Sequence, residues 1–154
     1  MAALEYGGEF LGGDHPDLAV SMNNIAAVHQ WADRHEEALR WAKKALAQRE
    51  PKLGLDHPWL AHSLFTIGQA SLDSGRHDEA IAAFERIERL LAGNEHLPVL
   101  LAESRLHLAE VLWATERDRE RGLALARAVL RERPGTEEAT TAAEKIAGWG
   151  HPVP

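Results

Sequence analysis

Cysteine is absent from the 154 residues of the chain. Its absence excludes disulfide bonds, thiolate metal sites and a cysteine nucleophile, and it fits a reducing compartment, so we expect a cytoplasmic protein. No apolar run approaches the ~18–20 residues that span a bilayer. The first ten residues, MAALEYGGEF, lack the basic start and apolar core of a signal peptide. We therefore expect a chain without membrane spans or covalent cross-links.

Basic residues are scarce relative to acidic ones. The chain has 17 Lys and Arg against 24 Asp and Glu, which gives a formal net charge of −7 at pH 7. Because a net negative surface repels phosphates, this composition disfavours nucleic acid as a partner. Hydrophobic residues make up 45% of the chain, enough to build the core of one domain at this length.

Motifs of common catalytic sites are also missing. No GxxxxGK[ST], H-E-x-x-H or G-x-S-x-G pattern occurs, and the protein-kinase signatures are absent. Three carboxylate pairs stand at expected helix starts, where they favour the helix dipole; they are Glu36-Glu37, Asp78-Glu79 and Glu137-Glu138. We predict no enzymatic activity, no metal and no cofactor, and a small metal-dependent hydrolase is the least favoured function.

An internal repeat of 42 residues organises the chain. The stretch GGDHPDLA, from Gly12 to Ala19, recurs as GLDHPWLA from Gly54 to Ala61, and Asp14 and Asp56 are 42 positions apart. The same offset relates RHEEA at 34–38 to RHDEA at 76–80. A third, weaker copy begins near residue 95. Repeat-related histidines are expected to cap helices and form turns rather than to bind metal; they are His15 with His57 and His35 with His77.

Each copy has the pattern of two helices. In the first copy, apolar and small residues recur along one helical stripe: Leu18, Met22, Ile25, Ala26 and His29. Pro16 and Pro58 are expected in the first turn of the first helices, after an Asp-His pair that can cap them. Small residues where the paired helices meet should allow close approach; they are Ala26, Ala38, Gly68 and Ala80.

This pattern resembles the tetratricopeptide repeat. The second copy matches with Leu64, Ile67-Gly68, Ala80, Phe84 and Ile87, and the first copy with Met22, Ile25-Ala26, Ala38, Ala42 and Ala45. The 42-residue period and the Gly-x-Asp-His-Pro opening look like the kinesin-light-chain variety, as does the run Asn23-Asn24-Ile25-Ala26. The resemblance implies an all-α, right-handed superhelix of about three helix-turn-helix repeats plus a capping helix.

The predicted organisation follows the copies. It comprises residues 1–11 as the end of a preceding repeat helix, 12–53, 54–94 and 95–134 as three units, 135–149 as a capping helix, and 150–154 as a tail. The third unit departs from the pattern, because Arg105 stands where Met22 and Leu64 stand. We expect this copy to be degenerate or exposed at that position. Trp149 is expected to anchor the capping helix. For the unpaired start at residues 1–11 we expect either self-association through that end or fraying of the first residues.

The resemblance also implies a function in protein–protein interaction. Members of this family bind peptides in a concave groove lined by the first helix of each repeat. The groove residues predicted from the helical phase are Asn23, Asn24, Gln30, Trp31, His62, Phe65, Gln69, Leu72, Asp73, Glu103, Leu106, Glu110 and Trp113. The asparagine amides can pair with the backbone of an extended peptide. For Trp31 and Trp113, packing and ligand contact both remain open.

Charge narrows the expected partner. The first helices contain no Lys or Arg except Arg105, whereas Asp73, Glu103 and Glu110 are expected to point inward. We therefore expect an extended basic and apolar peptide, and we disfavour an acidic C-terminal ligand. An alternative is a regulatory or oligomerising C-terminal segment of a larger bacterial signalling protein, since the last unit is similar to repeat arrays that follow bacterial serine/threonine kinases.

Overall fold

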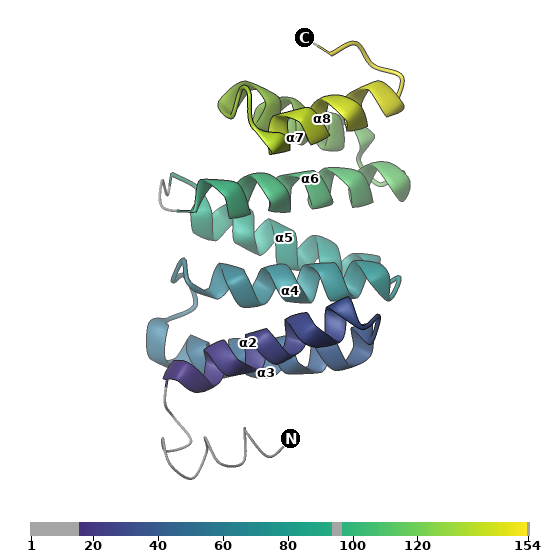
Figure 1. The fold of residues 1–154 in the computed structure, drawn as a ribbon. Coiled ribbons are helices and arrows are strands. Elements are labelled where there is room, and N and C mark those ends of the chain that lie inside the picture. Colours follow the sequence, from purple (N-terminus) through teal and green to yellow (C-terminus); the bar gives the residue numbers. More distant parts are fainter. Residues whose placement is uncertain (1–15, 94–96, 154) are drawn as a thin grey trace.

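The computed structural model describes residues 16–93 and 97–153 of the chain. In these ranges the chain forms helices and no strand, and the helices are α2 (Pro16–Trp31), α3 (His35–Leu53), α4 (Leu60–Asp73), α5 (His77–Leu91), α6 (Pro98–Ala114), α7 (Arg119–Glu132) and α8 (Glu137–Gly148). The helices stack in chain order, from α2 and α3 at one end to α8 at the other (Figure 1). The predicted all-α repeat fold is confirmed. The predictions for residues 1–11, for the cap at Asp14-His15 and for self-association through that end lie outside the described residues.

Helix starts follow the sequence signals with one exception. Pro16 and Pro98 open α2 and α6, as a residue without an N–H can. Pro58 was expected in the first turn of a helix, but α4 begins only at Leu60. The reason is a tight turn before the helix, in which the Leu60 N–H donates to the His57 carbonyl at 3.0 Å. The His57 ring caps this turn, since its Nδ1 accepts the Trp59 N–H at 3.2 Å.

The turn inside each helix pair has the same backbone geometry. Asp33, Gly75 and Glu116 occupy equivalent positions, and all three have a positive φ, of 54°, 70° and 57°. This left-handed residue closes the first helix, because the next N–H can then reach back to an unpaired carbonyl. In the second pair the Arg76 N–H donates to the Ser71 carbonyl at 2.7 Å. Each first helix is thereby reversed onto its second helix at a fixed point.

A small residue faces a large one where α4 crosses α5. Gly68 and Phe84 are both buried, and a Cβ atom added at Gly68 would lie 2.6 Å from ring carbons of Phe84. In the first unit the equivalent positions hold Ala26 and Ala42, both 0% exposed. The volume at this crossing is therefore supplied by two alanines in one unit and by one phenylalanine in the next.

Successive units are joined by a row of ion pairs along the turns. Arg76, in the turn of the second pair, lies 2.6 Å from the Glu36 carboxylate at the start of α3. Arg117 contacts Asp78 in the same way one unit later. An acidic residue in the first turn of a second helix thus has two favourable interactions. It lies at the positive end of the helix dipole, and it pairs with an arginine of the next unit.

A second row of ion pairs joins the second helices of neighbouring units. Along this row the acidic and basic partners exchange positions from one pair to the next. Lys43 of α3 lies 2.5 Å from Glu79 of α5, and Arg121 of α7 lies 2.5 Å from Glu85 of α5. Lys43 and Glu85 are 42 positions apart, and so are Glu79 and Arg121, so the two pairs are equivalent contacts with opposite polarity. These partly exposed pairs contribute little energy each, but they tie neighbouring units to each other.

The third unit departs from the other two at Arg105. Its side chain is only 17% exposed, so this position is degenerate but not exposed. The guanidinium runs toward the second helices and pairs with Glu88 at 3.3 Å and with Glu132 at 2.6 Å. The long methylene stem of arginine allows such a route from a position that elsewhere holds a leucine.

Helix α8 closes the stack against α6 and α7. Thr136 caps it by accepting the Ala139 N–H at 3.3 Å, as a threonine before a helix often does. Ala142 and Ile146 are 0% exposed and join the main core. The Trp149 ring stacks on Trp113 with centroids 4.6 Å apart, which agrees with its expected role as an anchor.

Candidate functional site

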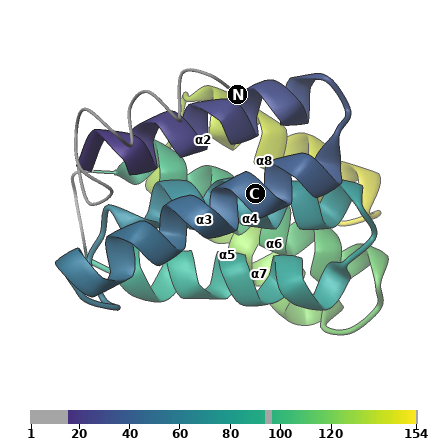
Figure 2. The same cartoon turned by 90° about the horizontal axis from the view of Figure 1, so that it is seen from below.

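The first helices α2, α4, α6 and α8 share one side of the stack. Each contacts the next first helix, and viewed along the stack α2 and α5 lie on opposite sides (Figure 2). We call their outer surface the first-helix face. Its partly or fully exposed residues form rows across the units: Val20, His62 and Glu103; Asn24, Thr66 and His107; Ala27, Gln69 and Glu110; Trp31, Asp73 and Ala114. Most of the predicted groove residues belong to these rows.

The end of this face at α2 is open and aromatic. Trp31 is 83% exposed, and the neighbouring Gln30 donates to the Asp73 carboxylate of α4. Asn23 and Asn24 differ, although both were predicted to face a ligand. Asn24 is exposed, whereas the Asn23 amide donates to the buried Ser63 hydroxyl at 3.0 Å and joins α2 to α4. Only Asn24 is therefore available to a peptide backbone.

The middle of the face is turned somewhat from the predicted phase, because three predicted residues lie deeper than expected whereas His62, Gln69 and Glu110 stay on the surface. Leu106 is only 5% exposed, and Leu72 packs against the core. Phe65 is half-buried with its ring 5.6 Å from that of His107. Neighbouring positions therefore carry the surface, namely Thr66 and His107. Helix periodicity alone places a face only to within one residue, and the polar residue beside each apolar one was the available signal.

His107 stands at the centre of the face and is held neutral. Its ring stacks on Phe84 with centroids 5.4 Å apart. Burial lowers its pKa below the ordinary value of 6.5, and the nearby Glu110 carboxylate only partly opposes this. The pKa of His62 is lowered as well, by burial and by the charge of Arg49. Both imidazoles therefore favour the uncharged form, which offers one donor and one acceptor nitrogen.

A hollow of about 270 Å³ opens on this face between α6 and α8. Its floor includes Leu106, and carboxylates of both helices line it, among them Glu103 and Glu137. Burial raises the pKa of Glu103, and the neighbouring carboxylates Glu138 and Glu137 raise it further. Repulsion among these carboxylates is incompletely neutralised, so a cation placed here would be stabilised.

Lys145 of α8 was missed by the sequence reasoning. It lines the same hollow, and its ammonium lies 2.7 Å from the Glu110 carboxylate. The helix at 135–149 was predicted only as a cap, so its charges were not counted in the face. Its place as a fourth first helix, one step beyond α6, was the signal that could have revealed them.

Trp113 lies at the far end of the face and is covered by the chain itself. Besides the stack on Trp149, its ring meets the edge of His151 at 5.6 Å and the guanidinium of Arg119 at 5.2 Å. Of the two roles left open for this residue, the structure favours packing. Trp31, in contrast, has no ring partner among the described residues.

No group of three or more histidine and carboxylate side chains suited to a metal occurs within residues 16–93 and 97–153. The three carboxylate pairs lie in the first turns of α3, α5 and α8. No described helix is both long and apolar enough to cross a bilayer.

Comparison with known proteins gives a consistent result. The family model for the tetratricopeptide repeat matches residues 17–92. Two crystal structures of nearly identical repeats of this type, assigned to a kinesin light chain of Podospora anserina, superpose with TM-scores of 0.77 and 0.76. Both are 19% identical in sequence, and each match covers 96% of this chain and 74% of the other. At this identity the likeness concerns the fold. No curated protein sequence matches significantly.

Proposed function

Since residues 17–92 place this chain in the tetratricopeptide repeat family, we propose that its first-helix face binds an extended segment of a partner protein. Repeats of this family generally mediate protein–protein interaction. The proposal adds a chemistry to that role, namely a segment with Lys or Arg beside bulky apolar side chains. A regulatory role within a larger bacterial signalling protein stays a second prediction, because no described contact favours it.

The charge of the face is the observation that carries the proposal. The helices α2 and α4 contain no Lys or Arg, and Arg105 of α6 turns away toward Glu88 and Glu132. Carboxylates of three first helices remain, with Lys145 as their basic neighbour on α8. A face of this composition attracts basic segments and repels acidic ones.

Exposed apolar groups supply the second half of the recognition. Trp31 and Val20 are 83% and 48% exposed, and they lie beside the polar rows of α4. Aromatic anchors usually contribute most of the affinity at an interface, whereas charges mainly accelerate association. Binding should therefore depend on Trp31 at all salt concentrations, and its dependence on the carboxylates should weaken as salt rises.

A peptide array of basic-apolar, acidic and neutral sequences tests the proposal, followed by fluorescence anisotropy of the best binder. We expect basic-apolar sequences to bind, and we expect Trp31→Ala to weaken them by about tenfold or more. Glu103→Gln with Glu137→Gln should weaken binding at low salt. Glu120→Gln is the matched control, since this carboxylate is exposed on α7 and lies outside the first-helix face.

Two outcomes would contradict the proposal. One is a preference of the array for acidic sequences. The other is binding that survives Trp31→Ala and the double Glu→Gln variant unchanged. Trp31 is so exposed that its replacement should leave the fold intact, so loss of binding in that variant reports on the surface and not on stability.

A further inference from the structure

A larger hollow, of about 570 Å³, lies outside the first-helix face, where α6 begins and where α5 and α7 end. Its apolar walls are Leu91, Leu101, Ala102 and Val129. Its polar lining includes two arginines, Arg105 and Arg133, together with Glu132. The volume lies within the range of small-molecule sites.

The charged lining replaces leucines of the preceding unit. Repeat-equivalent positions hold Leu64, Leu90 and Leu91 in the second unit, and Arg105, Glu132 and Arg133 in the third. Leu64 and Leu91 are 4% and 0% exposed, so they fill the core there. The Glu132 side chain is 48% exposed, and ion pairs this exposed contribute at most about 1 kcal/mol, less than well-packed leucines do, so stability does not explain the exchange.

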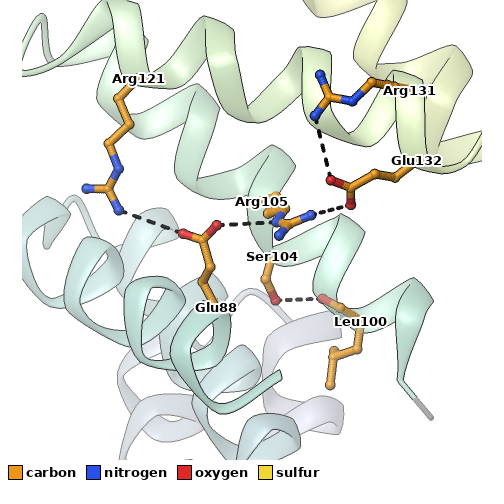
Figure 3. Close-up of polar contacts among 7 residues, drawn as sticks. All are labelled: Glu88, Leu100, Ser104, Arg105, Arg121, Arg131 and Glu132. Carbon is orange, nitrogen blue, oxygen red and sulfur yellow. Dashed lines mark hydrogen bonds and ion pairs between the residues drawn. The ribbon is translucent and has the colours of Figure 1, made fainter. Parts of the chain in front are cut away.

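The acceptors around the hollow are already used (Figure 3). One Glu88 oxygen lies 3.3 Å from Arg105 and the other lies 3.8 Å from Arg121. The two Glu132 oxygens face Arg105 at 2.6 Å and Arg131 at 3.9 Å. Each carboxylate oxygen of this network therefore has a guanidinium partner.

The donors, in contrast, are in surplus. A guanidinium carries five N–H groups. Arg105 uses Nε and Nη1 for its two glutamates, and Arg133 uses Nε for Glu138 at 3.2 Å. No described residue accepts from Nη2 of Arg105 or from either Nη of Arg133. Two arginines that line one hollow thus have hydrogen bonds left to make.

We propose that this hollow binds a small carboxylic acid with an apolar body. The carboxylate accepts hydrogen bonds from the unused N–H groups of Arg105 and Arg133, and the body packs against Leu91, Leu101 and Val129. The planar guanidinium fork suits a carboxylate geometrically. The hollow is separate from the first-helix face, so this proposal can be tested independently of peptide binding to that face.

Calorimetric titration with 4-phenylbutyrate tests this, with 4-phenylbutan-1-ol as the uncharged probe of the same body. We expect millimolar or tighter binding of the acid and at least about tenfold weaker binding of the alcohol. Arg105→Leu restores the residue of the second unit and removes the guanidinium from the hollow, so it should abolish binding. In that variant Glu88 and Glu132 keep Arg121 and Arg131 as neighbours, so neither carboxylate is left without a guanidinium partner.

Matched variants separate the site from general charge effects. Arg131→Leu removes an exposed arginine that does not line the hollow, and binding should persist. Arg105→Lys keeps the charge but loses the fork, and affinity should fall. A peptide with a free C-terminal phenylalanine and its amidated form show whether the acid can also come from a protein end. Absence of binding, equal binding of acid and alcohol, or binding that survives Arg105→Leu would overturn the proposal.

Discussion

At the crossing of α4 and α5, the Phe84 ring decides whether a substitution at Gly68 raises or lowers the free energy of unfolding. Replacing Gly68 by alanine adds a Cβ atom that would lie 2.6 Å from Cε1 and Cζ of Phe84. Ordinary carbon contacts are ~3.5–4.0 Å, so the ring must move by about 1 Å. Phe84 is 0% exposed and has the His107 ring stacked on it, with Phe65 against its edge, so it has little room to move.

Two effects of opposite sign decide the magnitude. Overpacking of this kind typically destabilises by ~1–3 kcal/mol. Alanine in a helix interior gains ~0.5–1 kcal/mol over glycine. We therefore expect Gly68→Ala to lower the free energy of unfolding by about 0.5–2 kcal/mol, a decrease of ~2–4 °C in Tm for each kcal/mol at this chain length.

Removing the ring should reverse the effect. In a Phe84→Leu background the added Cβ of Gly68→Ala no longer meets an aromatic ring, so only the helix-propensity gain remains. Urea unfolding followed by circular dichroism should show Gly68→Ala destabilising the parent and stabilising the Phe84→Leu variant. Gly148→Ala serves as control, because a Cβ there meets nothing within 4 Å and should stabilise slightly. The same sign in both backgrounds would refute the packing argument.

Three further predictions concern a cap, a titration and an ion pair. Thr136→Ala should lower stability by ~1 kcal/mol in thermal melts, because the hydroxyl caps α8, whereas Thr136→Ser should not. Since burial depresses the pKa of His107, the unfolded state binds its proton first, so stability should fall as pH drops below about 6.5; His107→Gln should flatten this profile. Glu79→Lys should destabilise by up to ~1 kcal/mol by opposing Lys43, and adding Lys43→Glu should recover the part of this loss that comes from the pair, since the reversed pair exists one unit later.

The sequence was sufficient for the architecture because its signals repeat. The recurrence of the Asp-His-Pro opening and of small residues such as Ala38 and Ala80 predicted two helices in each unit. The structure has two helices in each of these units. A signal found twice at one offset leaves few alternative folds. Local details without a repeated counterpart, such as the turn that delays α4 past Pro58, were not predictable in this way.

The candidate site was less predictable, for physical reasons. One residue step turns a helix by 100°, about the width of its apolar stripe, so a small error in the phase exchanges a core residue such as Leu106 with its surface neighbour His107. Arg105 was ambiguous because a long side chain can leave the direction that its position sets. Lys145 enters the face because α8 stacks on α6 like a further first helix, and a capping role alone did not indicate this.

The reversed polarity of the second-helix row has a consequence for how such an array can change its length. A tandem duplication of the second unit would place one copy's Glu85 against the other copy's Glu79, and loss of that unit would place Lys43 against Arg121. Both recombination products meet like charges at a junction that the present order keeps attractive. The contacts are individually weak, yet both favour the present order of the units. They disfavour a duplicated, lost or exchanged unit. Descendants that keep these two ion pairs can change their surface residues more readily than their number of repeats.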